Sequence, residues 1–321
     1  MKIRKFLSSK TCRVIAFSIL TTVILGTLTA CMNAINYTYQ NADKYTAGDR
    51  NISEKVDTID IDYLSGDIVL NATTSDAIEI KETINKTVKD EMKVHTWVND
   101  GTLYVRFCES GRGLDFTNIN KKLDITIPSD MALNDLKVEI SSGSFTGKAI
   151  NANAVNVNAS SGEIDVDCTA DKIKLMASSG SIALKQKGDS SEIKLEASSG
   201  RIKADVENAT NVKVDTSSGN AELNGKNVKE INTNASSGDG KYTFNVVPEK
   251  SSFTASSGEI TIYIPEDSDI KVTSTHSSGD FDYELPFGKD GNNFVCGGGK
   301  NTMKLTTSSG DQKIMKLKSG E

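Results

Sequence analysis

The chain has 321 residues and is acidic, because 43 Asp and Glu residues outnumber 37 Lys and Arg residues and leave a formal net charge of −6. This balance argues against a protein that binds nucleic acid or an anionic membrane surface through general electrostatic attraction. No long amphipathic helical pattern is visible, and glycine and proline are confined to predicted bends, so a helical architecture is excluded as well.

The N-terminal segment, residues 1–30, has the pattern of an export signal. A basic start precedes a largely apolar run over 14–27, which is shorter than the roughly 20 residues that a spanning helix needs. The quartet Leu28-Thr29-Ala30-Cys31 resembles the lipobox of bacterial lipoproteins. That resemblance implies that Cys31 receives a diacylglyceryl thioether and becomes the new N-terminus after cleavage. The alternatives are a plain secretory signal and an uncleaved anchor, and both also export the domain.

Cleavage before Cys31 would remove five positive charges and no negative ones, so the net charge would change from −6 to −11. A domain of that charge has no general attraction to an anionic membrane, and acyl chains would hold it at the surface instead. Residues 31–55 are polar and lack periodicity. They predict a lipid-anchored flexible tether with a root-mean-square reach of about 25–30 Å.

The triplet Ser-Ser-Gly organises the remainder of the chain, and a degenerate forerunner, Leu64-Ser65-Gly66, precedes the series. Successive triplet glycines are 19, 18, 20, 19, 19, 20, 21 and 31 residues apart. This period is typical of a repeat architecture with one insertion near its C-terminal end. The triplet glycines are Gly143, Gly162, Gly180, Gly200, Gly219, Gly238, Gly258, Gly279 and Gly310.

Apolar and polar residues alternate on both sides of each glycine. Around Gly180, Ile173 and Leu175 precede the glycine, and Ile182 and Leu184 follow it. This alternation predicts two short strands per repeat, each with one buried face, joined by a sharp bend at the glycine and followed by a connection. Because the apolar positions keep their phase in every repeat, we predict an all-β fold, a single β-helix-like β-solenoid of about ten coils over 56–318, with 18–21 residues per regular coil.

Two insertions interrupt the predicted repeat. In the first, 71–122, the sequence Asn99-Asp100-Gly101 between alternating runs is a strong hairpin signal. We expect this insertion, which follows the first coil, to be antiparallel β structure that covers the open edge of that coil. The second, 284–302, is expected to be a loop or a small hairpin ahead of the final coil.

Three cysteines remain after the proposed lipidation site, namely Cys108, Cys168 and Cys296. They lack metal-ligand spacing, and a single disulfide between two of them is an open alternative that the sequence cannot assign. Cys168 lies six residues after Gly162, at a predicted inward position. We therefore expect a buried thiol there rather than a reactive one.

No constellation for catalysis is visible. The only histidines are His95, in the first insertion, and His276, on a late coil. There is no nucleophile elbow, phosphate-binding glycine loop or zinc cluster. We predict no catalytic residues, no enzyme activity and no cofactor other than the acyl lipid at Cys31.

One column of residues has an acidic bias. The residue after the glycine is acidic on three triplets in succession, at Asp239, Glu259 and Asp280. If coils stack at about 4.8 Å, repulsion between neighbouring carboxylates costs about 1 kcal/mol per pair in water. Relief by a calcium ion is one hypothesis, and a solvated column without metal is the favoured interpretation.

The combined pattern resembles a known family. Its motifs are the export signal, the strand end Ile127-Pro128, the repeated Ser-Ser-Gly and the glycine-rich stretch Gly297-Gly298-Gly299-Lys300 before the last triplet. Over 55–318 they resemble the bacterial "putative adhesin" domain family of unknown function, also described as toastrack-type β-solenoids. The resemblance implies a surface-exposed repeat domain with roles in adhesion or envelope stress, and it implies no catalytic residues.

These observations favour a non-enzymatic, lipid-anchored protein of the bacterial cell surface, which acts as an adhesin or as an envelope-stress interaction protein. The expected location is extracytoplasmic, and the expected partners are the membrane, through the lipid, and an envelope protein or glycan, but not nucleic acid. The alternative is a cell-wall glycan-binding module or a polysaccharide-active enzyme. The stacked serines are interpreted first as corner residues and second as a flat polar surface for glycans.

Overall fold

The structure is a computed structural model that describes residues 36–113, 118–291 and 293–318. The export signal, Cys31 and the first part of the predicted tether lie outside these residues. The described chain forms two compact units, and the smaller contains residues 36–40 and 110–113. In the smaller unit, β1 (Asn36–Tyr37) pairs antiparallel with β9 (Arg112–Gly113).

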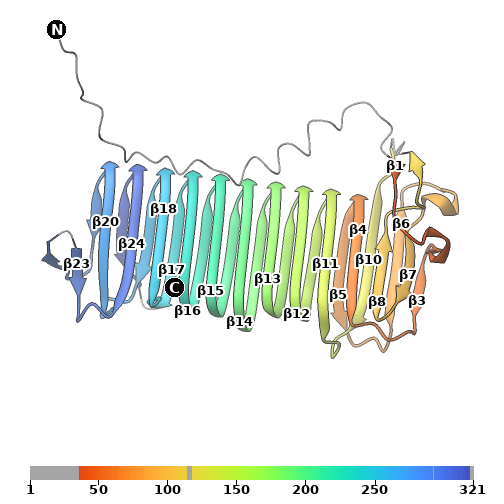
Figure 1. The fold of residues 1–321 in the computed structure, drawn as a ribbon, viewed down its shortest axis with the longest axis horizontal. Coiled ribbons are helices and arrows are strands. Elements are labelled where there is room, and N and C mark those ends of the chain that lie inside the picture. The colour runs from red at the N-terminus through yellow and green to blue at the C-terminus, as the bar shows by residue number, and fades with distance from the viewer. Residues whose placement is uncertain (1–35, 114–117, 292, 319–321) are drawn as a thin grey trace, which may run out of the picture. The chain divides into compact units, whose positions relative to one another are not determined.

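The larger unit is an all-β stack of coils (Figure 1), as predicted. In each coil, the strand before the triplet glycine joins one parallel ladder, called sheet A, and the strand after it joins a second, called sheet B. Sheet A contains β4 (Thr58–Ser65), β11 (Leu133–Ser142), β18 (Lys250–Ser257), β24 (Asn301–Ser309) and β20 (Ile270–Ser278). Sheet B contains β5 (Asp67–Thr73), β17 (Gly240–Val246), β19 (Ile260–Ile264), β25 (Gln312–Lys316) and β21 (Phe281–Tyr283).

Five central strands belong to both sheets, which differs from the predicted two short strands and a connection. Each runs through sheet B and then through sheet A of the next coil, and has 16 to 18 residues. Neighbouring coils have nearly equal length, so parallel pairing resumes after the second corner without a loop. Three of the four pairs of these long strands have a register shift at that corner. These strands are β12 (Phe145–Ser161), β13 (Ile164–Ser179), β14 (Ile182–Ser199), β15 (Ile202–Ser218) and β16 (Ala221–Ser237).

The hydrophobic core consists of the side chains that the repeat placed inward. Ile173 and Leu175 before Gly180, and Ile182 after it, are at most 1% exposed. Sheet pairing keeps these columns aligned, since Ile173 lies beside Val155 and Ile193 of the adjoining coils. The predicted inward positions are therefore confirmed.

The triplet glycines are required because neighbouring coils meet at them. Their φ angles lie between 111° and 158°, a region that L side chains rarely adopt. A Cβ at any of them would lie only 1.7–2.4 Å from a carbonyl oxygen of the adjoining coil. The N–H of Gly162 also donates to the carbonyl of Ser179 at 2.9 Å, and the same bond recurs from coil to coil.

The last coil in the sequence is not the last in space. β24 lies between β18 and β20, and β25 lies between β19 and β21 (Figure 1). The chain therefore leaves a gap after the coil of Gly258, builds the coil of Gly279, and returns to fill the gap with the coil of Gly310. The prediction that the Gly310 coil ends the array is wrong, because strand order depends on long-range pairing that a sequence period does not contain.

The first insertion covers the N-terminal end of the stack, as expected. β7 (His95–Asn99) and β8 (Thr102–Arg106) form an antiparallel hairpin, and β8 extends sheet A beside β4. β6 (Ile78–Ile84) pairs antiparallel with β10 (Lys121–Pro128), which extends sheet B beside β5. The insertion and β10 together thus add two strands to the edge of each sheet, β8 and β7 to sheet A and β10 and β6 to sheet B.

The predicted flexible tether is wrong over 41–55. A 3-10 turn, η1 (Ala42–Lys44), leads into β2 (Thr46–Ala47), which pairs with β7, and β3 (Arg50–Ile52) pairs with β6. Ile52 is only 3% exposed. These strands are too short to show a period of their own, and their partners lie in the insertion, so the segment looked unstructured in sequence.

A buried ion pair stabilises this N-terminal cap. Lys121 Nζ lies 2.9 Å from Glu82 Oε1, and the two side chains are 0% and 2% exposed. Lys121 also donates to the carbonyl of Phe107 at 2.7 Å, while Glu82 accepts from Tyr63 Oη at 2.6 Å and from the Val94 N–H at 2.8 Å. Burial lowers the pKa of Lys121, and its pairing with Glu82 opposes that shift.

At the other end, the second insertion contains a small hairpin, one of the two expected forms. β22 (Gly288–Asp290) and β23 (Asn293–Cys296) pair with each other, and β23 pairs antiparallel with β20. Cys108, Cys168 and Cys296 are buried, and no disulfide joins any two of them. Burial raises the pKa of the Cys168 thiol to about 12, in agreement with the expected unreactive role.

Replacing Gly162 by alanine should destabilise the protein by more than about 3 kcal/mol, because a backbone clash adds to an unfavourable φ. The new Cβ would lie 1.8 Å from the Gly143 carbonyl oxygen. Gly291 is the matched control, because it has a φ of 58° with nothing within 4 Å. Gly291→Ala should cost only about 1–2 kcal/mol. Urea unfolding of the two variants measures the difference, and equal losses would contradict the close-approach explanation.

Glu82→Ala should cost about 3–5 kcal/mol, because it leaves the Lys121 ammonium buried without its counter-charge. The control is Glu230→Ala, which breaks the Lys250–Glu230 pair, whose side chains are 72% and 46% exposed. That loss should stay within about 1 kcal/mol. The free energy of unfolding, from urea titration monitored by circular dichroism, tests both variants. A Glu82→Ala variant as stable as Glu230→Ala would show that the buried pair is not needed for the cap.

Candidate functional site

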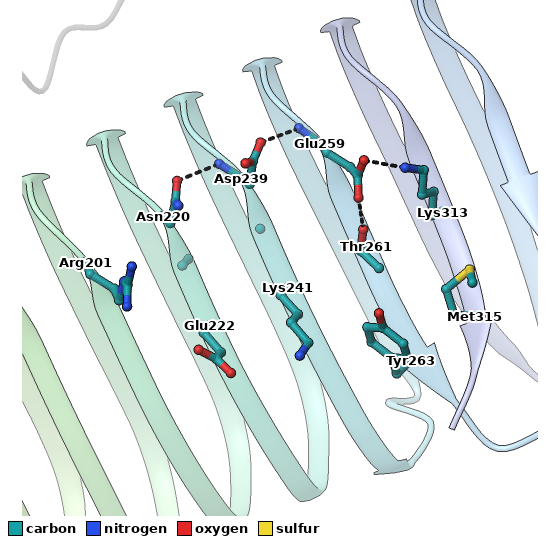
Figure 2. Close-up of a pocket in the computed structure, with 12 residues that line it drawn as sticks. Arg201, Asn220, Glu222, Asp239, Lys241, Glu259, Thr261, Tyr263, Lys313 and Met315 are labelled. Carbon is teal, nitrogen blue, oxygen red and sulfur yellow. Dashed lines mark hydrogen bonds and ion pairs between the residues drawn. The ribbon is translucent and has the colours of Figure 1, made fainter. Parts of the chain in front are cut away.

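A groove of about 640 Å³ crosses the outer face of sheet B, over the coils of Gly200, Gly219, Gly238, Gly258 and Gly310. Its walls are outward side chains one, three and five positions after each triplet glycine (Figure 2). Because coils stack in register, each of these positions forms a column across the sheet. The groove therefore exists only where several coils adjoin.

The first column forms a chain of side-chain to backbone hydrogen bonds (Figure 2). Asn220 Oδ1 accepts from the N–H of Asp239 at 3.0 Å, and Asp239 Oδ1 accepts from the N–H of Glu259 at 2.9 Å. Farther along, Asp311 Oδ1 accepts from the N–H of Asp280 at 3.1 Å. Backbone donors thus compensate the carboxylates that were expected to repel one another.

The prediction that acidic residues occupy adjoining coils is correct for Asp239 and Glu259, but Asp280 does not adjoin Glu259. Asp311 lies between Glu259 and Asp280, since the Gly310 coil is inserted there. The groove is lined by Asp239 and Glu259 but not by Asp280. Among the described residues, no group of three or more His, Cys, Asp or Glu side chains could hold a metal ion, so the geometry expected for the calcium hypothesis is not present.

Glu259 is held by two partners from the groove. Lys313 Nζ pairs with Glu259 Oε2, and Thr261 Oγ1 donates to Glu259 Oε1 at 2.5 Å. The hydrogen bond from Lys313 is the main cause that lowers the pKa of Glu259, and the same bond raises the pKa of Lys313. Glu259 therefore stays ionised at neutral pH and is poorly suited to act as a general acid.

The other side of the groove carries groups that are not committed to ion pairs. Lys241 Nζ lies 5.4 Å from the centroid of the Tyr263 ring, on its face. Within the described part of the chain, Arg201, Glu222 and Lys241 make no salt bridge. Figure 2 shows Arg201, Glu222 and Lys241 on three successive strands, with Lys241 on the strand next to that of Tyr263. The groove thus combines a partly exposed aromatic ring with charges of both signs, which suits a polar ligand with an apolar face.

Sequence reasoning missed most of these groove residues. Counting from the glycines does place Lys241 three and Tyr263 five positions after a glycine, so the repeat register could have located both. It could not have located Lys313 beside Glu259, because that contact depends on the insertion of the Gly310 coil between two earlier ones. The period identified columns but not the order of the coils.

The other residues singled out in the sequence do not join this groove. His95 is 7% exposed, with its Nδ1 2.9 Å from the carbonyl of Lys93 in the cap, and His276 is exposed on the terminal coil. The triplet serines lie at the corner between the sheets and are exposed, except Ser217 and Ser236, which are half-buried. In the residues that the structure describes, there is no helix long and apolar enough to cross a membrane.

Comparison with solved structures agrees on the fold. A "putative adhesin" from Parabacteroides merdae matches with a TM-score of 0.50 and 12% identity, over 88% of this chain and 100% of that one. A "putative adhesin" from Parabacteroides distasonis matches with a TM-score of 0.52 and 12% identity, over 85% of this chain and 97% of that one. At this identity the likeness establishes the architecture alone.

A search of curated proteins finds no significant relative. The family model described as Toastrack DUF4097 matches residues 56–315, which includes every triplet glycine and the first insertion. The match agrees with the stacked coils, the glycine corners and the absence of helices other than short 3-10 turns among the described residues. The chain therefore belongs to the Toastrack DUF4097 family.

Proposed function

We propose that this protein is a non-enzymatic, lipid-anchored binding protein of the bacterial cell surface, of the adhesin type. The observation that carries this proposal is the outer face of sheet B, where a groove holds uncommitted charges and an aromatic ring on a rigid stack. Glu259, the carboxylate at its centre, is ionised and fixed by Lys313 and Thr261. Such a surface is suited to binding, since its functional groups are positioned by parallel ladders and not by mobile loops.

Two further points support the proposal. The similar solved structures from Parabacteroides merdae and Parabacteroides distasonis are each described as a "putative adhesin". The sequence Leu28-Thr29-Ala30-Cys31 follows a basic and then an apolar segment, as in exported lipoproteins. Two acyl chains on Cys31 provide stable membrane attachment, whereas a single chain gives only weak, reversible binding.

A carbohydrate of the cell envelope is the second candidate, as the ligand of the same groove. Tyr263 and Lys241 favour it, because an aromatic ring with polar groups around it can contact the apolar face of a sugar while those groups bind its hydroxyls. The groove is lined by residues of five successive coils, and so can accommodate a polymer that extends across several coils. Within this proposal Arg201 and Glu222 are further hydrogen-bonding groups for the ligand.

The lipid anchor is tested by Cys31→Ala. In a bacterial host that processes lipoproteins, this substitution should move most of the protein from the membrane fraction to the soluble extracytoplasmic fraction, because the thioether cannot form. Cys12→Ala is the matched control, since Cys12 lies within the leader, and it should leave the distribution unchanged. Fractionation, with mass spectrometry of the N-terminal peptide, reads out both variants. Full membrane retention of Cys31→Ala would refute lipid anchoring.

The groove is tested by co-sedimentation with purified insoluble peptidoglycan. Tyr263→Ala should weaken binding by about tenfold, the loss typical of an exposed aromatic contact residue, while Tyr263→Phe should retain most of it. Met176→Ala, on the outer face of sheet A, is the control and should bind like the original protein. If peptidoglycan binds but Tyr263→Ala does not weaken it, the ligand lies elsewhere. If no peptidoglycan is retained at all, the carbohydrate proposal fails for this polymer.

A further inference from the structure

The coil of Gly279 ends the stack and has a neighbouring coil on one side only. β20 and β21 pair there with β24 and β25. On the other side, β23 pairs with Ile270–Thr273 alone. The remaining stretch, residues 274–284, has no strand partner on that side within the described chain, and is called the open edge. At the opposite end, β8 and β10 cover the equivalent edges of both sheets.

Two backbone donors on the open edge lack acceptors that their counterparts have. In every other coil, the triplet glycine donates its N–H to a serine carbonyl of the next coil, and the residue two positions later donates to a second carbonyl of that coil. In the Gly258 coil, the N–H of Gly258 donates to the carbonyl of Ser309 at 3.1 Å. The N–H of Ile260 donates to the second carbonyl at 2.9 Å. The N–H groups of Gly279 and Phe281 have no such acceptor in the described residues. The edge is therefore a template for one more strand.

The open edge carries three carboxylates at alternate positions. Asp280, Asp282 and Glu284 occupy the one, three and five positions after Gly279, which face outward on sheet B, and all three are exposed. None of them forms a salt bridge within the part of the chain that the structure describes. Within the described residues, the only hydrogen bond that their side chains accept joins the backbone N–H of Lys316 to Glu284 Oε2 at 3.0 Å. An added strand would lie beside three carboxylates that form no salt bridge, while Lys313 on the neighbouring strand interacts with Asp282 electrostatically.

Inside the stack, sheet B compensates such charges between coils. Lys148 Nζ lies 2.6 Å from Asp165 Oδ2 on the next coil, and Lys313 pairs with Glu259 in the same way. A strand that continues this pattern at the open edge would carry Lys or Arg at alternate positions. Opposite charges on neighbouring strands stabilise their pairing, so a strand with basic side chains would be favoured at this edge over other strands.

The inward side of the open edge is aromatic. Phe281 and Tyr283 contact Phe294 of the terminal hairpin, with ring centroids 4.7 Å and 5.5 Å apart. Tyr283 remains 43% exposed, although its position four residues after a triplet glycine is buried on the inner coils. An added strand would cover this ring with the residues that alternate with its basic side chains, and those residues would be apolar.

We propose that the open edge binds an extended segment of a partner protein by strand addition, and that this segment alternates Lys or Arg with apolar residues. Backbone hydrogen bonds to Gly279 and Phe281 provide affinity, and Asp280, Asp282 and Glu284 provide selectivity. A second copy of this chain fits less well, because pairing of two open edges would place the carboxylates of one copy beside those of the other, and these would repel. This proposal involves neither the groove nor the lipid anchor.

The probe is a short fluorescein-labelled peptide in which lysine alternates with valine, titrated with the full chain in detergent and followed by fluorescence anisotropy. Binding should saturate and weaken as salt rises. Replacing every lysine of the peptide by glutamate should abolish binding. The combined variant Asp280→Asn, Asp282→Asn and Glu284→Gln should weaken it at least about tenfold, since it removes all three charge partners.

The matched control is a second triple variant on the same face of sheet B, with the same loss of charge but away from the open edge. It combines Asp67→Asn, Glu163→Gln and Asp205→Asn, none of which lines the groove, and should bind the peptide like the original protein. Because an added strand turns only alternate amides towards the edge, N-methylation of one alternate set should abolish binding. Methylation of the other set should have little effect.

Three results would overturn the proposal. One is equal weakening by the two triple variants, which would show that net charge alone attracts the peptide. Another is equal sensitivity to the two N-methylation patterns, which would exclude strand addition. The third is a dimer of the free chain, seen by analytical ultracentrifugation, that the peptide fails to dissociate and that Phe281→Pro disrupts, which would assign the edge to a second copy. Circular dichroism confirms that each variant is folded.

Discussion

The structure depends on the close approach of neighbouring coils at the triplet glycines. There the backbone of one coil occupies the space that a side chain of the next would need, with carbonyl oxygens 1.7–2.4 Å from each missing Cβ. This contact fixes the height and phase of each coil. As a result, the inward columns form one core, and the outward columns form straight rows of charge and hydrogen-bonding groups on sheet B. The groove and the open edge are both consequences of that alignment.

A stack of coils leaves an exposed strand edge at each end unless other strands cover it, and the two ends of this stack are covered to different extents. The N-terminal end is covered by antiparallel strands and fixed by the buried Lys121–Glu82 pair, with its partners Tyr63 and Phe107. The C-terminal end is covered only in part, and leaves backbone donors, carboxylates and an aromatic ring accessible. Covering one end prevents edge-to-edge association there, while the other end keeps the geometry that strand addition requires.

Much of the candidate site follows from where the chain departs from its repeat. The chain passes over one coil position after Gly258 and fills it later with the coil of Gly310, which places Lys313 beside Glu259 and Asp311 beside Asp280. In the row of acidic residues, for which calcium was the less favoured interpretation of the sequence, Asp239 and Asp311 accept from backbone N–H groups and Glu259 pairs with Lys313. Charges that remain unpaired, in the groove and at the open edge, are therefore the ones available to ligands.

By itself, the sequence determined the all-β solenoid, the coil length, the inward residues such as Ile173 and Leu175, and the hairpin at Asp100-Gly101. These features depend on alternation, glycine spacing and turn chemistry, which are local. Only the tertiary structure decided that 41–55 adds strands to the cap, that the Gly310 coil is inserted ahead of the Gly279 coil, and that Tyr263 and Lys313 share a groove. Those features depend on which strand edges pair. Coils with the same repeat length can stack in several orders, and only long-range contacts distinguish these orders.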